Sequence, residues 1–400
     1  MANVSSSNGL EKRPKLRFPG FDDPYRTITL GQIASLVNRT DPTSNAPIMM
    51  LSAGNGFIMQ SEKYSRDNAG QSLKKYILLK KGELAYNHGA SKAKQYGCCY
   101  ELTENEARIP YVYHCFKISG TEHTPYVATA LNNPKIDRQL KRLVSSSVRM
   151  DGLLNISFDD YMSVILHLPS LKEQTHIADF LKKLDERITS QEKLVASLKK
   201  YKRGLLMHYF SDDNTLQWKQ YTISQIGKVI TGSTPPTNDR SNYDGDLLFC
   251  SPGDIGEQKY ISSTEKRVSP KGFALGRVIP PSSVIVTCIG LIGKLGIATT
   301  DMITNQQINA LIVSEDFDHE FIYYAFENFF PKYRSKVSMQ TLPILSKSEF
   351  ERLLIKVPNL NVQHKISNYL AGMDKRIEHT QQELNMLQEL RRGIIQKLFI

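Results

Sequence analysis

Residues 168–188 read LPSLKEQTHIADFLKKLDERI, and residues 357–377 read VPNLNVQHKISNYLAGMDKRI. The two stretches align without a gap, and the match continues from KRGLLMHYF (202–210) to RRGIIQKLF (391–399). The coinciding pairs include Pro169 and Pro358, Leu171 and Leu360, Gln174 and Gln363, Ile177 and Ile366, Leu181 and Leu370, Asp185 and Asp374, Arg187 and Arg376, Ile188 and Ile377, Leu198 and Leu387, Arg203 and Arg392, Gly204 and Gly393, and Phe210 and Phe399. The chain therefore contains one unit twice, which predicts an internal pseudo-two-fold repeat.

Both stretches have the heptad pattern of a helix that packs on another helix. The apolar positions are Ile177, Leu181, Leu184, Ile188, Val195 and Leu198 in the first copy, and Ile366, Leu370, Met373, Ile377, Leu384 and Leu387 in the second. A polar residue, Gln191 or Thr380, interrupts each series at the matching place. We expect the two helices to pack antiparallel, with these polar residues near the middle. The simpler alternative is that the stripe serves packing alone.

Each helix is expected to begin after a proline and to end in basic residues, which suit the negative end of the helix dipole. A helix of about forty residues is roughly 60 Å long, which exceeds one turn of DNA at about 34 Å. Gly204 and Gly393 interrupt the helices near their ends. We interpret them as sites where two helices approach closely, with fraying as the alternative.

The remaining sequence consists of two globular segments rich in short strands. The domain organisation that we predict is a tail at 1–17, a globular domain at 18–167, a helix at 168–212, a second globular domain at 213–357 and a last helix at 358–400. Strands are predicted at 76–79, 111–113, 164–166, 247–249 and 284–286. The segments repeat weakly, since YRTITLGQI (25–33) resembles WKQYTISQI (218–226) and residues 80–87 occupy a place similar to 281–287. The predicted fold class is α+β.

Bulk composition favours a polyanionic partner. The 400 residues carry a net charge of +11, which is typical of proteins that bind nucleic acid. Five cysteines without CxxC spacing indicate free, mostly buried thiols in a reducing compartment. No apolar run reaches the roughly 18 residues of a membrane span, so we expect a cytoplasmic protein.

The sequence lacks a recognisable catalytic motif. It contains no GxxxxGK[ST], GxGxxG, GxSxG or HExxH pattern, and its nine histidines show no metal-ligand spacing. We therefore predict a non-catalytic chain that holds no metal or cofactor of its own. An enzyme of unfamiliar kind stays open as an alternative.

Candidate DNA-reading residues occur in polar loops of both globular segments, because Arg, Lys, Asn, Gln, Ser and Thr make most base and phosphate contacts. The stretch that follows a predicted strand at 87–97 is expected to be an exposed loop. The candidates are Lys74, Lys75, Asn87, His88, Ser91, Lys92, Lys94 and Tyr96 in the first segment, and Thr231, Ser233, Thr234, Thr237, Ser251, Lys294, Asn305, Gln306 and Gln307 in the second.

The helical repeat resembles the conserved regions of type I restriction-modification specificity subunits. The first copy carries the pattern at Pro169, Leu171, Glu173, Gln174, Ile177, Phe180, Leu181, Leu184, Asp185 and Ile188, with Lys202, Gly204 and Phe210 downstream. The second copy departs from it at Val362, where the first has Glu173, and we expect a weaker contact at that helix start. The strings GELAYN (82–87) and NQQINA (305–310) resemble strings common in the target-recognition domains of this family.

This resemblance implies a subunit that does no chemistry. Two target-recognition domains would each read one half of a split, asymmetric DNA site, and the paired helices would set the unread spacer. The implied partners are double-stranded DNA, two methyltransferase subunits and two restriction-translocase subunits, and the partner subunits would carry S-adenosylmethionine, ATP and Mg²⁺.

We assign the repeated helix residues to helix–helix contact or partner docking. These residues are Gln174, Ile177, Leu181, Asp185, Ile188, Gln191, Leu198, Gly204, Gln363, Ile366, Leu370, Asp374, Ile377, Thr380, Leu387 and Gly393. A different class of function is also open, namely a coiled-coil scaffold that bridges proteins without DNA specificity.

Overall fold

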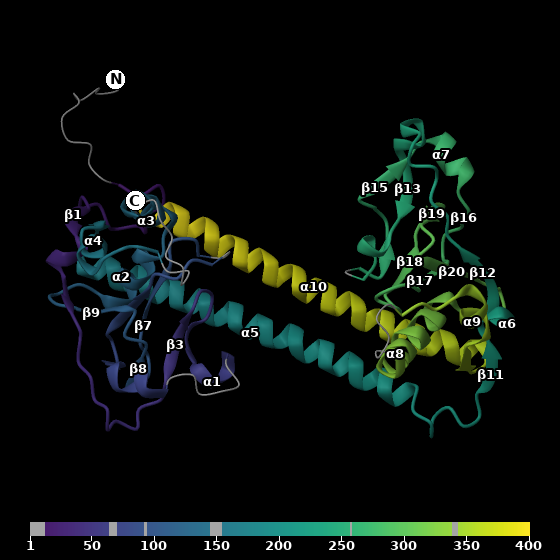
Figure 1. Ribbon diagram of the computed structural model, residues 1–400, viewed down its shortest axis with the longest axis horizontal. Helices are drawn as coiled ribbons and strands as arrows, with labels where there is room; N and C mark the ends of the chain where they lie inside the picture. Colours follow the sequence, from purple (N-terminus) through teal and green to yellow (C-terminus); the bar gives the residue numbers. More distant parts are fainter. Residues whose placement is uncertain (1–12, 64–69, 92–93, 145–153, 257, 338–342) are drawn as a thin grey trace. The chain divides into compact units, whose positions relative to one another are not determined.

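The computed structural model describes residues 13–63, 70–91, 94–144, 154–256, 258–337 and 343–400 (Figure 1). The chain divides into two compact units. The first unit comprises Met1–Gln191 and Glu383–Ile400, and the second comprises Glu192–Gln382. Each unit therefore combines one globular segment with parts of both long helices.

The first unit is built around a four-stranded antiparallel sheet in the order β2-β9-β6-β7. These strands are β2 (Ala34–Leu36), β9 (His114–Ile118), β6 (Leu84–Asn87) and β7 (Cys98–Glu101). Three antiparallel pairs complete its strands: β1 (Arg26–Thr29) with β10 (Ile165–Leu168), β3 (Met49–Ser52) with β4 (Gly56–Met59), and β5 (Ile77–Lys80) with β8 (Glu106–Ile109). The short helices are η1 (Leu30–Gln32), α1 (Gln60–Lys63), η2 (Gly70–Lys75), α2 (Thr124–Leu131), α3 (Pro134–Leu143) and α4 (Phe158–Met162).

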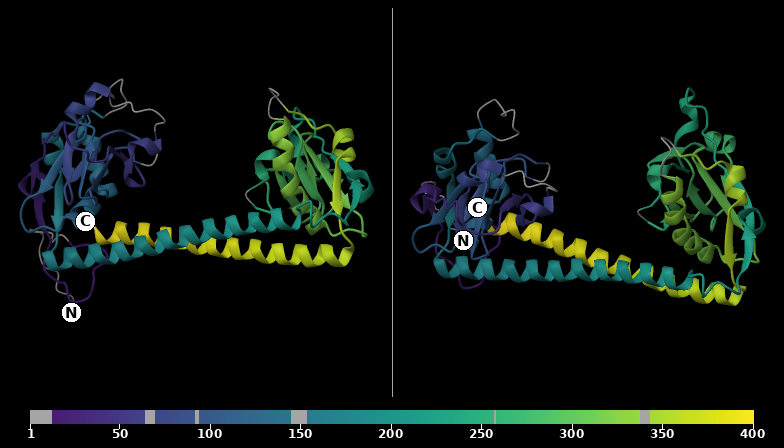
Figure 2. Two further views of the ribbon diagram at one scale, coloured as in Figure 1. Left: turned by 90° about the horizontal axis from the view of Figure 1, so that it is seen from below. Right: turned by 60° about the horizontal axis from the view of Figure 1, so that its bottom comes forward.

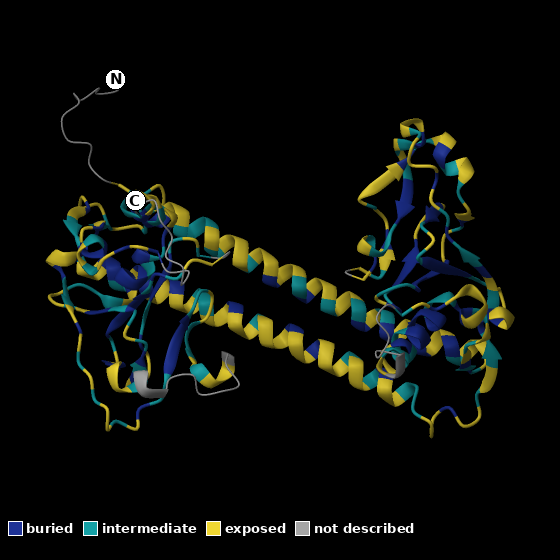
Figure 3. Ribbon diagram, viewed as in Figure 1, coloured by how far each residue is buried: buried dark blue, intermediate teal, exposed yellow. Residues whose placement is uncertain are grey.

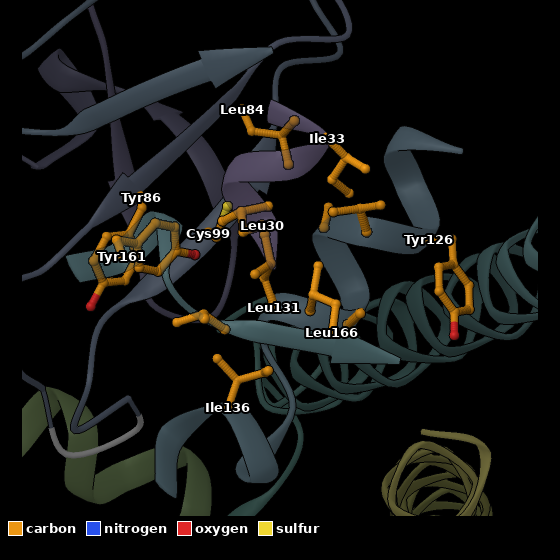
Figure 4. Packing of buried hydrophobic residues seen from close by; sticks show 14 of the residues in the cluster. Leu30, Ile33, Leu84, Tyr86, Cys99, Tyr126, Leu131, Ile136, Tyr161 and Leu166 are labelled. Atoms are coloured by element: carbon orange, nitrogen blue, oxygen red, sulfur yellow. The ribbon is translucent and has the colours of Figure 1, made fainter. Parts of the chain in front are cut away.

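The core of the first unit joins the sheet to the long helices. Tyr86 and Tyr161 stack with ring centroids 3.8 Å apart at 8°, beside the buried Leu30 (Figure 4). Leu181 from one long helix and Phe399 from the end of the other belong to the same apolar cluster. The helices are thus part of this core, because their apolar faces replace water against the sheet domain.

The second unit contains two sheets. The first has the order β12-β20-β17-β18-β14, and the second has the order β15-β13-β19-β16. Their strands are β12 (Gly227–Thr231), β20 (Ile308–Val313), β17 (Val284–Thr287), β18 (Leu295–Ala298) and β14 (Tyr260–Ile261), then β15 (Lys266–Val268), β13 (Tyr243–Cys250), β19 (Met302–Thr304) and β16 (Val278–Ile279). A separate pair joins β11 (Lys219–Thr222) to β21 (Leu354–Val357). The short helices are α6 (Ile223–Ile226), η3 (Arg240–Asn242), η4 (Pro252–Asp254), α7 (Pro270–Leu275) and α9 (Lys347–Arg352), and α8 (His319–Val337) is a longer helix.

Local signals recur in the two units. The order β2-β9-β6-β7 has a counterpart in β12-β20-β17-β18, and all of these neighbours are antiparallel. The turns before β6 and β17 place Gly82 at φ 83° and Ser282 at φ 66°. Capping boxes of Thr29 with Gln32 and of Thr222 with Gln225 start matching short helices. Similar short-range chemistry therefore builds both units, although Ser282 adopts a left-handed conformation that favours glycine.

The two long helices are α5 (Leu171–Tyr209) and α10 (Leu360–Leu398), each of 39 residues. Their bounds agree with the repeat within a few residues. In the first unit Asp185 pairs with Arg391, and Gln191 donates to Glu383 at 2.8 Å. From Asp185 to Gln191 the residue numbers of α5 rise, while those of their partners on α10 fall from 391 to 383. The helices therefore run antiparallel there, as expected.

The second unit has the same pairing between the other parts of these helices. Lys202 lies 2.6 Å from Asp374, and Lys199 donates to Gln381 at 3.5 Å. Lys202 and Asp374 are the repeat counterparts of Arg391 and Asp185. Figure 2 shows the helix segments side by side within each unit, and Figure 3 shows buried positions along both helices.

A buried glutamine joins each long helix to its globular segment. Gln174 is 0% exposed; it accepts a hydrogen bond from the His123 N–H at 3.0 Å and donates to the Pro169 carbonyl at 3.0 Å. Gln363 is 1% exposed and repeats this arrangement with the Asp318 N–H at 2.9 Å and the Pro358 carbonyl at 2.9 Å. These side chains satisfy backbone groups at the start of α2 and α8 that would otherwise be buried without a partner.

Close approach at the two helix glycines was expected and is wrong. A Cβ atom added at Gly204 or Gly393 would have no described atom within 4 Å, apart from its chain neighbours and the adjoining backbone of its own helix. The buried positions of the helices carry larger side chains instead, such as Leu198 in the second unit and Leu384 in the first. The glycines therefore lie away from the tight packing.

The predicted strand at 111–113 is also wrong, because these residues form a turn that leads into β9.

The end of the predicted N-terminal tail at residue 17 needs correction as well. Leu16 donates its N–H to the Lys397 carbonyl at 3.0 Å, and Arg17 forms a bidentate pair with the buried Glu173 at 2.9 and 2.8 Å. Residues 1–12 lie outside the described residues. At the second helix start, Val362 packs against the apolar core where Glu173 makes an ion pair in the first.

No helix among the described residues has the length and apolar character that a membrane crossing demands.

Replacing Gln363 by Met should lower the free energy of unfolding of the second unit by about 2–4 kcal/mol, because the buried Asp318 N–H and Pro358 carbonyl lose their partners while the volume stays similar. Gln382→Met on the exposed face of the same helix is the control, with a cost below about 0.5 kcal/mol. Urea unfolding followed by circular dichroism measures both. Equal costs would contradict the role assigned to Gln363.

Candidate nucleic-acid interface

In the second unit, three loops meet where strands β12, β13 and β19 end. Cys250 of β13 lies opposite Thr304 of β19 in a parallel pair, and the Asn305 N–H donates to the Cys250 carbonyl at 3.0 Å. The Ser233 N–H donates to the Thr304 carbonyl at 2.8 Å. Backbone hydrogen bonds therefore bring the predicted residues of 231–234, 251 and 305–307 to one edge.

Side-chain hydrogen bonds fix this edge further. Thr234 donates its hydroxyl to the Gln306 Oε1 at 2.6 Å, and Thr231 donates to the Asn309 Oδ1 at 2.6 Å. Asn305 Oδ1 accepts the Gln307 N–H at 3.0 Å, while Asn305 Nδ2 donates to Gln307 Oε1 at 3.2 Å. The edge is thus a cross-linked set of hydroxyls and amides.

Glycine is required at position 232 of this edge. A Cβ atom there would lie 2.1 Å from the Asn305 carbonyl oxygen and 2.3 Å from the Thr304 carbonyl oxygen and hydroxyl. The hydroxyls of Ser233 and Thr304 are buried and have no hydrogen-bond partner among the described residues. The close approach of the two backbone segments therefore shapes the loop, and these two hydroxyls can still form hydrogen bonds inside it.

The other candidate residues of the second unit differ in their exposure and in their hydrogen bonds. Ser251 caps its own turn by donating to Asp254 Oδ2 at 2.7 Å. Lys294 is half-buried and donates to the Pro252 carbonyl at 3.3 Å. Thr237 is exposed in the loop that follows β12.

Arg277 is a residue that the sequence did not single out. Its Nη1 donates to the Thr231 carbonyl at 3.0 Å, and the side chain is exposed. Within the described part of the chain it has no carboxylate partner. A lone arginine before a two-residue strand carries no motif, so only the fold reveals its position beside Thr231.

In the first unit, the loop predicted at 87–97 is partly buried, although an exposed loop was expected. His88 is 5% exposed, and its Nδ1 and Nε2 lie 2.7 and 2.9 Å from the carbonyls of Leu154 and Val112. The expectation that His88 lies in an exposed loop is therefore wrong, because the loop folds under neighbouring backbone. Asn87 accepts the Gly89 N–H at 2.9 Å, which fixes its carbonyl oxygen inside the turn.

The basic residues of this unit are distributed over several segments. Lys94 is half-buried and donates to the Asn132 carbonyl at 2.9 Å, whereas Ser91 is exposed. Lys74 and Lys75 are exposed, and the Lys75 Nζ lies 5.9 Å from the Tyr111 ring centroid. The last aromatic candidate, Tyr96, is half-buried and accepts the Tyr86 hydroxyl at its carbonyl at 2.6 Å. Lys92 lies outside the described residues.

Two stacked histidines lie in the first unit. The rings of His88 and His114 are 4.9 Å apart, and His114 Nε2 lies 2.9 Å from the Ile156 carbonyl. Burial lowers the pKa of His114 because the charged imidazolium loses its hydration, and the His123 pKa is lowered for the same reason. Burial therefore favours the neutral form of His114 and of His123.

The thiols are confirmed as free and buried. Burial raises the pKa of Cys98 to about 11 and the pKa of Cys250 to about 12. Deprotonation of either sulfur is thus suppressed, and these sulfurs act as small apolar groups. Among the residues that the structure places, no three His, Cys, Asp or Glu side chains gather as a metal site.

The repeated helix residues are mostly used within the chain. Gln174, Ile177, Leu181, Ile188, Leu198, Gln363, Ile366, Leu370 and Thr380 are buried, Asp185, Gln191, Asp374, Ile377, Leu387 and Gly393 are half-buried, and Gly204 is exposed. The large apolar side chains that remain exposed on the helices are Leu171, Phe180, Leu194, Tyr201, Met207, Leu360, Tyr369, Met386 and Leu390. Any protein that docks on the helices would meet this second set.

Part of the chain is similar to a known protein family. Residues 216–389 match the family described as the type I restriction modification DNA specificity domain. The matched part lies mostly in the second unit, and its description agrees with the resemblance that the helical repeat carries.

Its sequence relatives are specificity subunits. The chain is 28% identical over 189 residues to the type I restriction enzyme MjaIX specificity subunit of Methanocaldococcus jannaschii, which covers 46% of this chain and 44% of the relative. It is 31% identical over 108 residues to the HindI specificity subunit of Haemophilus influenzae, which covers 26% of this chain and 24% of the relative. The matched part thus spans less than half of the length of these two relatives.

Solved structures share the fold at low sequence identity. The S subunit of a type I restriction-modification system from M. genitalium matches with a TM-score of 0.62 and 14% identity, covering 97% of this chain and 99% of that chain. A chain from a study of the assembly and conformational transition of a type I R-M system matches with a TM-score of 0.58 and 17% identity, covering 96% and 98%. Such likeness establishes mixed α/β architecture with long helices.

The buried histidines predict a pH dependence of stability. The depressed pKa of His114 stabilises the fold above the ordinary histidine pKa of about 6.5, and this contribution is lost as pH falls through the depressed value, because the unfolded chain then binds more protons. Thermal unfolding at pH 7.5 and pH 5.5 should show a smaller loss for His114→Gln than for the unaltered protein. His208→Gln, which replaces an exposed histidine on α5, is the control. An unchanged pH dependence in His114→Gln would contradict this assignment.

Proposed function

We propose that this chain is the DNA-specificity subunit of a type I restriction-modification complex. The observation that carries the proposal is the specificity-domain match at 216–389, which covers the three-loop edge at Thr231, Ser251 and Asn305. A surface rich in hydroxyls and amides suits the reading of base edges. In this function the subunit selects DNA and leaves the chemistry to its partners.

Each unit is proposed to be a target-recognition domain that reads one half of a bipartite, asymmetric site. The shared strand order and the matching capping boxes support a repeat of one domain, related by pseudo-two-fold symmetry. The loop side chains differ between the units, since amides and hydroxyls dominate one edge and lysines occur in the other. Two different half-sites follow from two different sets of side chains.

The long helices are proposed to set the length of the unread spacer. The ion pairs of Asp185 with Arg391 and of Asp374 with Lys202 support a fixed register between them. A packed heptad seam resists sliding, because a shift would expose apolar residues and separate these charges. The helices would therefore act as a ruler.

The exposed apolar side chains of the helices are proposed to dock partner proteins. Two methyltransferase subunits would bind there, and two restriction-translocase subunits would complete the assembly. S-adenosylmethionine, ATP and Mg²⁺ would be held by those partners. Adenine methylation and cleavage would then be directed by this subunit, which itself remains non-catalytic.

The competing function is a coiled-coil scaffold without DNA specificity. A DNA-reading subunit loses affinity steeply with salt, because binding releases counterions from the phosphates, whereas a protein scaffold mainly responds through its apolar contacts. The net charge of +11 favours the first of the two.

Sequencing of adenine methylation, in cells with and without the gene, tests the proposal directly. Loss of one split, asymmetric methylated motif upon deletion, and its return upon complementation, is the expected result. If the partner enzymes are present and methylate the same motifs without this chain, the proposal fails. Purified protein should then be examined for salt-dependent binding to duplex DNA.

If the long helices set the spacer, shortening them should shorten the DNA segment between the two half-sites. Deleting residues 191–197 and the matching residues 380–386 removes one heptad from each helix, or about 10 Å, which corresponds to roughly three base pairs. The methylated motif should keep both half-sites and lose about three base pairs of spacer, unless the complex no longer assembles. A motif with its original spacer would exclude the ruler.

A further inference from the structure

The second unit presents hydrogen-bond donors at its three-loop edge. The Asn305 Oδ1 accepts the backbone N–H of Gln307, which fixes the orientation of the Asn305 amide. Asn305 Nδ2 must then donate to Gln307 Oε1, and the Gln307 Nε2 group has no partner among the described residues. The internal bonds thus occupy the carbonyl oxygens and leave an NH₂ group for a ligand.

Two neighbouring side chains add donors to the same edge. Gln306 is exposed, and its Oε1 accepts the Thr234 hydroxyl, so its Nε2 group is also available. Arg277 uses Nη1 for the Thr231 carbonyl, which positions the guanidinium while its Nε and Nη2 groups keep their donors. Arg277, Gln306 and Gln307 form what we call the donor edge.

A donor edge selects a ligand that presents acceptors. In the major groove, guanine presents O6 and N7, two acceptors side by side, whereas adenine, cytosine and thymine each present a donor or a methyl group. Arginine is the most common partner of guanine because its planar fork can bond both acceptors. A phosphate also accepts, but phosphate contacts are usually made by lysines, arginines and backbone N–H groups. The donor edge contains a single cation among amides.

We propose that the donor edge reads a guanine in the half-site of the second unit, with Arg277 as the residue that determines this base. The inference rests on the proposed DNA-specificity function and deepens it. Thr231, Thr234 and Asn305 are positioning residues, since they fix the orientation of the donors and need not touch DNA.

The test uses three variants in cells whose gene has been deleted and replaced. Arg277→Lys keeps the charge and loses the planar fork. Gln307→Glu keeps the acceptor for Asn305 and exchanges the outward donor for an acceptor. Arg267→Ala is the matched control, because Arg267 is also exposed, also donates to a backbone carbonyl and belongs to β15 of the same sheet.

The base preference at every position of the methylated motif is measured by adenine-methylation sequencing. We expect Arg277→Lys to relax one guanine position of one half-site by roughly 5- to 100-fold, with the other half-site and the spacer unchanged. Gln307→Glu should relax the same position, and Arg267→Ala should retain the original motif.

The outcomes separate this inference from the function on which it rests. If the unaltered gene restores no split motif, the proposed function fails and the inference falls with it. A restored motif whose guanine preference survives Arg277→Lys overturns the inference alone. A uniform decrease of methylation in Arg277→Lys with all base preferences retained would assign Arg277 to phosphate, and this result also overturns the proposal.

Discussion

Hydrogen bonding of two buried glutamines determines how the long helices attach to the sheet domains. Gln174 and Gln363 each accept a backbone N–H from the start of a domain helix and donate to the carbonyl of the proline before their own helix. A buried amide tolerates few arrangements, because every unmet donor or acceptor costs free energy. The direction in which each helix leaves its domain is therefore specified by chemistry as well as by apolar packing.

The ends of the helices complete the domain cores. Leu398 and Phe399 belong to the core of the first unit, and Leu206 belongs to that of the second, with Phe210 packed against it. Lys135 also donates to the Phe399 carbonyl at 2.8 Å. The first domain therefore requires the last residues of the chain for its packing, so its N-terminal sequence alone does not contain a complete core.

The sequence was sufficient to predict the long helices, their direction and the positions of β5, β10, β13 and β17, because heptad periodicity and short apolar runs are local signals. The other strands were not predicted. The prediction of a strand failed at 111–113, where the apolar residues Tyr111, Val112 and Tyr113 form a turn. The prediction of close packing failed at Gly204, because this residue lies on an open face of its helix. The burial of His88 was equally invisible, since the carbonyls of Leu154 and Val112 approach it from distant positions. Long-range contacts thus account for these errors.

The polar edge of the second unit shows why the candidate residues could be found and their roles could not. Thr234, Asn305 and Gln307 stand out in the sequence as polar loop residues, yet the orientation of an amide depends on which of its atoms is already bonded inside the protein. Arg277 joins them only because β16 borders β19 in the folded sheet. Recognition by such an edge is a property of the hydrogen-bond network, in which residues that never touch a ligand decide whether it meets donors or acceptors.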